Sequence, residues 1–235
     1  MEHYDKAITR FSPDGHLFQV DYAFEAVKRG ACSIGLITEE AVILGIERKL
    51  VPKLQDPQSF KKIFILDNQL AMAASGLTAD ARILANKARL ECQQFRFTYG
   101  EDPSPTYIAR FLAKTYQKYT QTGGVRPYGV SSLIIGFENN NQPKLYLTEP
   151  SGNFSLWKAC AIGKKSKEVQ ELLEKKYKDN LNLEGGVKVV IEALLEVVDS
   201  ASKGIEICYM LSDRVLKFIS EGEINNLIGI IQKDK

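Results

Sequence analysis

The order of short apolar runs along the chain limits the fold more than any other sequence feature. Runs of several strand-like segments alternate with runs of amphipathic helices, instead of single strands alternating with single helices. Such grouping indicates packed layers rather than a doubly wound parallel sheet. We therefore predict an α+β protein, a four-layer αββα sandwich with an extra helix at the N-terminus. Because we find no linker, repeat or low-complexity segment, residues 1–235 are predicted to form one domain.

Local periodicity gives the expected elements. The predicted strands are Cys32–Ile37, Ala41–Glu47, Ile63–Asp67, Leu70–Ala74, Val130–Glu138, Lys144–Glu149, Phe154–Cys160, Glu206–Met210 and Val215–Ile219. The predicted helices are Leu17–Arg29, one around Ala81–Phe95, one opening at Ser104-Pro105, Lys165–Tyr177, Leu183–Ser200 and one from Ser220. A turn is expected at Ser12-Pro13-Asp14-Gly15, and Gly30 suits the C-cap of the first helix.

Composition excludes several classes of function. The net charge is only +2, so no basic patch favours nucleic acid. The four cysteines (Cys32, Cys92, Cys160 and Cys208) are far apart and lack the spacing of a zinc or redox site, so we expect buried free thiols and no metal or cofactor. The first ten residues have no apolar core of a secretory signal, and no apolar run approaches the ~20 residues that span a bilayer. We expect a soluble intracellular protein without a membrane partner.

Catalytic motifs are scarce. The two histidines, His3 and His16, lie near the N-terminus in turn-like contexts, which disfavours a Ser-His-Asp or Cys-His arrangement. No P-loop and no GxGxxG segment follows a predicted strand. The carboxylates show no spacing that demands acid–base chemistry.

The N-terminal segment carries the strongest signal. Tyr4-Asp5-Lys6, Thr9 and the run Phe11–Ala23 resemble the N-terminal signature of proteasome alpha subunits. Further similar segments follow in family order over nearly the whole chain: Glu25–Gly30, Gly76–Arg82, Arg126–Val130, Pro150–Gly152 and Ala161–Gly163. Within that family, Pro52–Asp56 and Leu90–Gln93 most resemble the fourth alpha-type subunit of eukaryotes.

The resemblance implies a fold and a role. The fold is the N-terminal-nucleophile hydrolase sandwich, with residues 1–30 as gate segment and assembly helix and residues 31–235 as the αββα body. The role is that of a non-catalytic structural and gating subunit in the outer ring of the 20S proteasome, in the cytoplasm and nucleus, serving ubiquitin-dependent protein degradation. The implied partners are other alpha subunits in a seven-membered ring, the beta ring and the C-terminal tails of regulatory particles.

The position of the protease nucleophile supports the non-catalytic interpretation. Beta subunits of this family expose a threonine by cleaving a Gly–Thr bond, but here Ala31 follows Gly30. None of the seventeen glycines is followed by Thr, Ser or Cys. Glu47 and Lys62 resemble the carboxylate and lysine of the protease site. The alternative is an N-terminal-nucleophile amidohydrolase or beta-type protease that matures at an unusual bond, with Cys32 or Ser33 as nucleophile.

The resemblance also assigns non-catalytic sites residue by residue. The gate cluster comprises Tyr4, Asp5, Pro13 and Tyr22; the assembly helix presents Phe18, Tyr22 and Phe24; and the activator-tail pocket comprises Lys62, Gly30 and Leu17. Lys6 departs from the arginine usual at that position and lacks its bidentate fork. The simpler alternatives are a disordered tail before an ordinary turn, a helix packed on its own domain and a solvated strand-end lysine.

Overall fold

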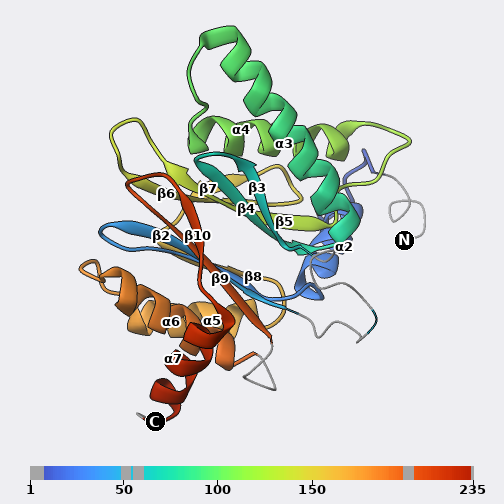
Figure 1. Cartoon of the computed structure of the whole chain (residues 1–235). Coiled ribbons are helices and arrows are strands. Elements are labelled where there is room, and N and C mark those ends of the chain that lie inside the picture. The colour runs from blue at the N-terminus through green and yellow to red at the C-terminus, as the bar shows by residue number, and fades with distance from the viewer. Residues whose placement is uncertain (1–7, 49–53, 55–60, 198–203, 234–235) are drawn as a thin grey trace.

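The computed structural model describes residues 8–48, 54, 61–197 and 204–233, and it confirms the predicted sandwich. Two five-stranded sheets lie face to face, and helices cover the outer side of each (Figure 1). Among the described residues, no helix combines the length and apolar character needed to cross a membrane.

Both sheets are antiparallel. The first has the order β10-β9-β2-β1-β8, and its strands are β1 (Ser33–Ile37), β2 (Ala41–Glu47), β8 (Ala159–Ile162), β9 (Ile205–Leu211) and β10 (Leu216–Phe218). The second has the order β3-β4-β5-β6-β7, and its strands are β3 (Ile63–Asp67), β4 (Leu70–Gly76), β5 (Val130–Phe137), β6 (Pro143–Thr148) and β7 (Phe154–Leu156).

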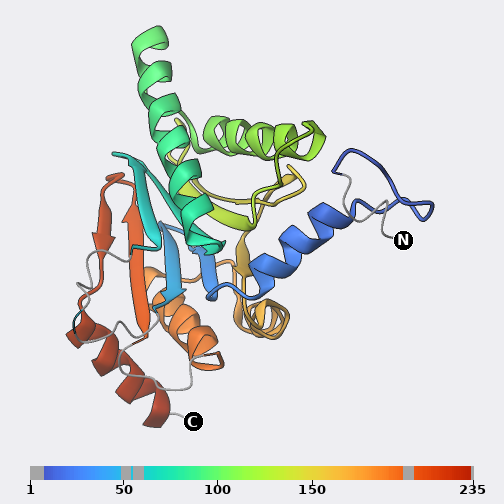
Figure 2. The same cartoon turned by 90° about the vertical axis from the view of Figure 1, so that its right-hand side faces the viewer.

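The helices form two outer layers and one separate element. The β3–β7 sheet is covered by α3 (Thr78–Tyr99) and α4 (Pro105–Gln121), and the other sheet by α5 (Ser166–Lys176), α6 (Leu183–Leu195) and α7 (Glu221–Lys233). Outside both layers, α2 (Phe18–Lys28) runs outward from the ends of the strands (Figure 2). As predicted, α4 begins with Ser104 as N-cap, whose hydroxyl accepts from the Tyr107 amide, and with Pro105 in its first turn.

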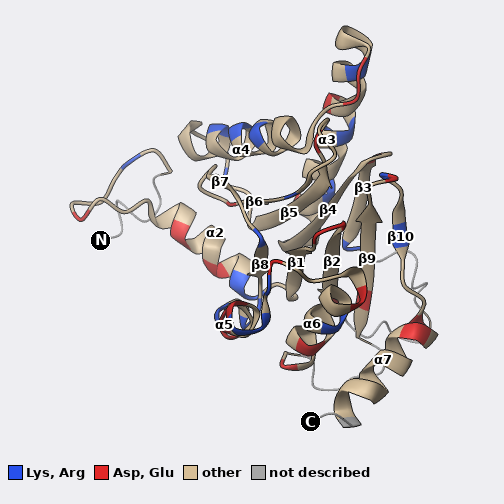
Figure 3. Ribbon diagram, turned by 90° about the vertical axis from the view of Figure 1, so that its left-hand side faces the viewer, with Lys and Arg blue, Asp and Glu red and all other residues tan. Residues whose placement is uncertain are grey.

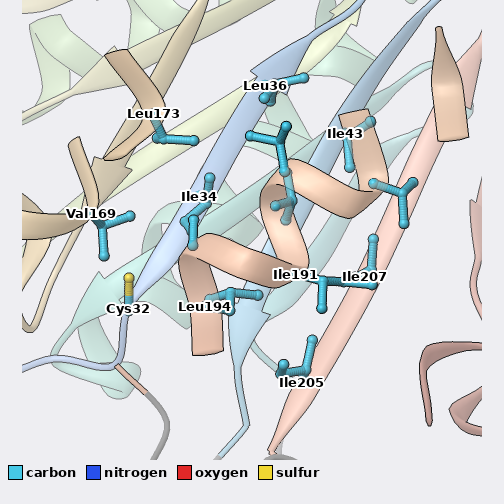
Figure 4. Close-up of a cluster of buried hydrophobic side chains, with 14 of the residues drawn as sticks. Cys32, Ile34, Leu36, Ile43, Val169, Leu173, Ile191, Leu194, Ile205 and Ile207 are labelled. Atoms are coloured by element: carbon cyan, nitrogen blue, oxygen red, sulfur yellow. The ribbon is translucent and has the colours of Figure 1, made fainter. Parts of the chain in front are cut away.

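Strand alternation builds the core. Ile34 and Leu36 of β1, together with Cys32 just before it, pack against α5 and α6 in one buried cluster (Figure 4). The opposite face of the same sheet packs on the second sheet. There the glycines permit close contact, because a Cβ on Gly35 would lie 2.5 Å from the Leu145 side chain. This agrees with the small residues seen in the predicted strands.

One predicted strand is wrong. The run Phe154–Cys160 is two strands in different sheets, since β7 pairs with β6 while β8 pairs with β1. The chain crosses between the sheets at Trp157 and Lys158, where three consecutive residues from Leu156 are exposed. Leu156 and Trp157 are apolar although they are exposed, so the sequence pattern does not show that the strand ends here. The predicted helix Leu183–Ser200 ends earlier, at Leu195, and its last residues lie outside the described ones.

At three glycines, near the end of α2, backbone segments from different elements are in close contact. A Cβ on Gly30 would lie 2.3 Å from the Gly76 nitrogen, and one on Gly76 would lie 2.2 Å from the Gly129 oxygen. A Cβ on Gly163 would lie 2.4 Å from the Ala31 oxygen. The prediction of Gly30 as C-cap is therefore wrong: Arg29 caps α2 in right-handed conformation, and Gly30 is needed for close approach.

We expect Gly30→Ala to destabilise the chain by about 1–3 kcal/mol, because backbone atoms leave no room for the methyl group. Gly123→Ala is the matched control, since a Cβ there would meet nothing within 4 Å. Urea unfolding of the purified full-length variants measures the difference. Equal stability of the Gly30 and Gly123 variants would contradict this account of the contact.

Candidate functional site

The candidate site is the corner where the chain leaves α2 and enters β1. The Gly30 carbonyl accepts from the Lys164 amide at 2.9 Å, and the Ala31 carbonyl accepts from the Ser75 hydroxyl at 2.8 Å. Hydrogen bonds therefore fix the backbone on both sides of the Gly30–Ala31 peptide bond.

Glu47 and Lys62 lie beside this corner, as the sequence predicts. The Lys62 ammonium donates to the Glu47 backbone carbonyl at 2.8 Å, and the Glu47 carboxylate accepts from the Cys32 amide at 3.1 Å. Lys62 is only 8% exposed, whereas Lys61 is exposed. The interpretation of Lys62 as a solvated strand-end lysine is therefore wrong, because its side chain ties β3 in one sheet to β2 in the other.

A small cavity of about 20 Å³ opens at this corner. Its lining consists of Ala31, Lys61, Lys62, Phe64, Ala74, Gly76, Thr78, Ala81 and Val130. That volume holds about one water molecule and is far too small for a peptide chain.

Neither alternative nucleophile lines the cavity. Cys32 packs into the cluster under α5 and α6 (Figure 4), where burial, reinforced by the charge of Glu47, raises the pKa of its thiol to about 12. The thiol is therefore protonated at neutral pH and a poor nucleophile. Ser33 is fully buried, and its hydroxyl has no hydrogen-bond partner in the described part of the chain. Among the described residues, no base therefore forms a hydrogen bond with this hydroxyl.

The predicted gate residues are only partly within the described structure. Tyr4 and Asp5 lie outside the described residues. Pro13 lies in the predicted turn, where the Gly15 amide donates to the Ser12 carbonyl at 2.9 Å and Gly15 takes a φ of +79°. Tyr22 lies in α2 and is 50% exposed.

The α2 helix has a buried and an exposed side. Val20, Ala23 and Val27 pack on the chain's own domain, so this part of the simpler alternative is correct. Tyr22 faces away from that contact, and Phe18 and Phe24 are only partly buried. The aromatic surface predicted for assembly is thus left accessible in the single chain.

Within this single chain, the three residues predicted for the activator-tail pocket do not all lie together. Gly30 packs on Gly76, which lines the cavity with Lys62. Leu17 lies just before the N-terminal end of α2, and Gly30 follows its C-terminal end, about 20 Å away along the helix axis. A pocket lined by both Gly30 and Leu17 would therefore need the Leu17 of a neighbouring subunit.

Sequence reasoning missed one structural link beside the site. Arg126 donates to both oxygens of Asp80 at 2.6 and 2.8 Å, and the Gly129 amide donates to the same carboxylate. Burial would raise the pKa of Asp80, but these hydrogen bonds outweigh it and lower that pKa. The two residues come from the separate segments Gly76–Arg82 and Arg126–Val130, which resemble the family. This shared resemblance was the only sequence signal that they meet.

The described residues contain no group of three or more His, Cys, Asp or Glu side chains that could hold a metal ion. All four cysteines are buried and free, as predicted.

Comparison with known proteins identifies the family. The family model for proteasome subunits matches residues 27–210, and the model for the N-terminal signature of proteasome alpha subunits matches residues 4–26. The chain belongs to the proteasome subunit family and is of the alpha type. It is therefore a structural subunit of the outer ring of the 20S proteasome, the particle that degrades proteins.

Curated relatives match over almost their whole length. A proteasome subunit alpha type-7 of Solanum lycopersicum is 51% identical and covers 100% of this chain and 91% of its own. A subunit alpha type-7 of Dictyostelium discoideum is 47% identical over 99% of this chain and 92% of its own, and the alpha type-7-A of Arabidopsis thaliana is 51% identical over 100% and 94%. All three relatives are named alpha type-7, whereas Pro52–Asp56 and Leu90–Gln93 had suggested the fourth alpha-type subunit.

Proposed function

We propose that this chain is an alpha type-7 subunit that contributes no nucleophile to its particle. Near 50% identity over the whole chain to proteins of that name supports the type. The methyl side chain of Ala31, the protonated Cys32 thiol and the fixed Gly30–Ala31 bond support the absence of catalysis. Its role is then to build and gate the outer ring, in the cytoplasm and nucleus, with seven alpha-type chains per ring next to a beta ring.

The exposed side of α2 is the surface we assign to ring assembly. Aromatic side chains are enriched at protein interfaces, because each buries a large apolar area at little conformational cost. Here the buried side of α2 fixes the helix on its own domain, so the aromatic side is held in a defined position. A preorganised surface of this kind reduces the entropy lost when a neighbouring subunit docks.

The N-terminal segment is the part we assign to the gate. Tyr4, Asp5, Pro13 and Tyr22 match the gate residues of the family. The Ser12–Gly15 turn supports this role, since it fixes the path of the chain just before α2. The Tyr22 hydroxyl can share a hydrogen bond with a gate residue, while its ring can serve the assembly surface.

Two substitutions at Tyr22 separate these roles. We expect Tyr22→Ala to reduce entry of the subunit into rings about tenfold, because it removes the ring from the exposed side of α2. Tyr22→Phe keeps the ring and loses only the hydroxyl, so it should assemble normally but lower activator-stimulated peptide turnover about two- to fivefold. Native mass spectrometry and peptide hydrolysis by the purified particle measure the two effects. Normal entry of Tyr22→Ala into rings would refute the assembly role. Unchanged activator-stimulated peptide turnover of Tyr22→Phe would refute the gate role.

Lys62 is the residue we assign to the C-terminal carboxylate of a regulatory partner. An ammonium in a partly dry pocket makes a strong charge-assisted bond with a carboxylate. The cavity supports this role, because it places Lys62 beside apolar groups from Phe64, Ala74 and Val130. Because this cavity alone is too small for a peptide chain, a neighbouring subunit must complete the pocket that would hold the end of an apolar peptide.

We expect Lys62→Ala to lower binding of a free-carboxylate tail peptide at this subunit at least tenfold. Lys188→Ala is the control, since Lys188 is an exposed lysine of α6 that does not line the cavity. Photocrosslinking of the peptide to assembled particles, resolved by subunit, measures the change. Equal crosslinking of the Lys62 variant and wild type would remove Lys62 from the site.

A further inference from the structure

A row of positive charges runs along the exposed side of α4. Arg110, Lys114 and Lys118 follow one another at intervals of four residues, so they lie on one side of the helix, and all three are exposed. The opposite side of α4, with Leu112 and Tyr116, is buried against the β3–β7 sheet. The helix contains no Asp or Glu, and Figure 3 shows blue bands on α4 without red. We call Arg110, Lys114 and Lys118 the basic stripe.

The basic stripe does not stabilise its own helix. Among the described residues none of its three cations forms an ion pair, whereas Arg96 of the neighbouring helix α3 is paired with Asp67. Like charges four residues apart on a helix repel each other. Lys118 lies in the last turn and suits the helix dipole, but Arg110 and Lys114 gain nothing from it. This spacing therefore points to a role outside the chain.

An open hollow of about 650 Å³ lies along the same part of α4. Its lining includes Lys114 and Lys118 of the stripe, the hydroxyl-bearing Thr115 and the aromatic Phe111, which is only partly buried. A polar border around apolar surface is typical of protein interfaces. Proteins that bind nucleic acid commonly contact about six to ten phosphates, so a row of three cations favours a protein partner.

We propose that the basic stripe docks on an acidic surface of an adjacent subunit of the particle. This inference rests on the proposed assembly with neighbouring subunits, and it states which charge one neighbour presents. Residues four apart on a helix are separated by about 6 Å along its axis, so the matching surface carries carboxylates at about that spacing. Complementary charges of this kind contribute more to the choice of the correct neighbour among similar subunits than to affinity.

The substitution Lys114→Glu separates this role from a structural one, because its two effects have opposite signs. In the isolated full-length chain the new carboxylate would lie four residues from both Arg110 and Lys118, so the variant should be at least as stable as wild type. In the particle the same carboxylate would repel the acidic surface, so incorporation of the subunit should fall about tenfold. The neutral Lys114→Gln should give an intermediate incorporation.

Incorporation is measured by competition. The variant and the wild-type chain are co-expressed in equal amounts, and their ratio in purified particles is read by intact mass. The control is Lys188→Glu, which changes the net charge equally at an exposed lysine of α6 and should compete as wild type does. Urea unfolding of each purified full-length chain gives the stability. Carbodiimide crosslinking of wild-type particles then identifies the partner, since it joins a lysine amine to a carboxylate in direct contact. We expect Lys114 or Lys118 to be joined to an Asp or Glu of another subunit.

The outcomes distinguish this inference from the proposed assembly. If the wild-type chain is found in particles but Lys114→Glu competes equally and neither lysine is crosslinked to another subunit, the inference fails and the proposed assembly stands. If the wild-type chain is absent from particles, the proposed assembly itself fails. A Lys114→Glu chain that is less stable than wild type and incorporates poorly would show that the stripe serves the fold. Normal incorporation together with weaker binding of fluorescent poly(U) RNA by the particle would make nucleic acid the occupant. Either of these last two results would overturn the proposal.

Discussion

Backbone-on-backbone packing at Gly30, Gly76 and Gly163 is the contact on which the rest of the structure depends. It joins the end of the N-terminal helix to strands of both sheets, and no side chain larger than hydrogen fits at these positions. The Ser75 hydroxyl closes the same joint by donating to the Ala31 carbonyl. Because interiors pack at crystal-like density, such a contact transmits position from one element to the next. The C-terminal end of α2 is therefore fixed against both sheets.

This joint also explains how a protease fold can serve as a building block. At this corner hydrogen bonds fix the Gly30 and Ala31 carbonyls, and the adjoining cavity has room for about one water. The lysine and carboxylate that resemble protease residues bond mainly to backbone atoms and brace the two sheets. At the same time α2 is held with the Tyr22 side chain exposed. The contact at Gly30 thus fixes both this corner and the direction in which α2 leaves the sandwich.

Much of the fold could be predicted from periodicity, and the exceptions have physical causes. Strands such as Ala41–Glu47 and Ile63–Asp67 were predicted to the residue, because buried apolar runs end there in charged residues. The crossing at Trp157 was missed, since its exposed residues are apolar and imitate a strand. The close approach at Gly30 was missed too, because a glycine after a helix has the same pattern whether it caps the helix or contacts another backbone. The ion pair between Arg126 and Asp80 was missed as well, because the two residues are 46 positions apart and no local pattern reveals that they meet.

The central claim is that this chain enters its particle uncleaved and without a nucleophile. Intact-mass measurement of the subunit released from purified particles, after treatment with an epoxyketone probe, tests it most directly. The account predicts a chain that retains its first thirty residues and carries no probe, while beta-type subunits in the same sample are labelled. A chain that begins near Ala31, Cys32 or Ser33, or one that carries the probe, would contradict it.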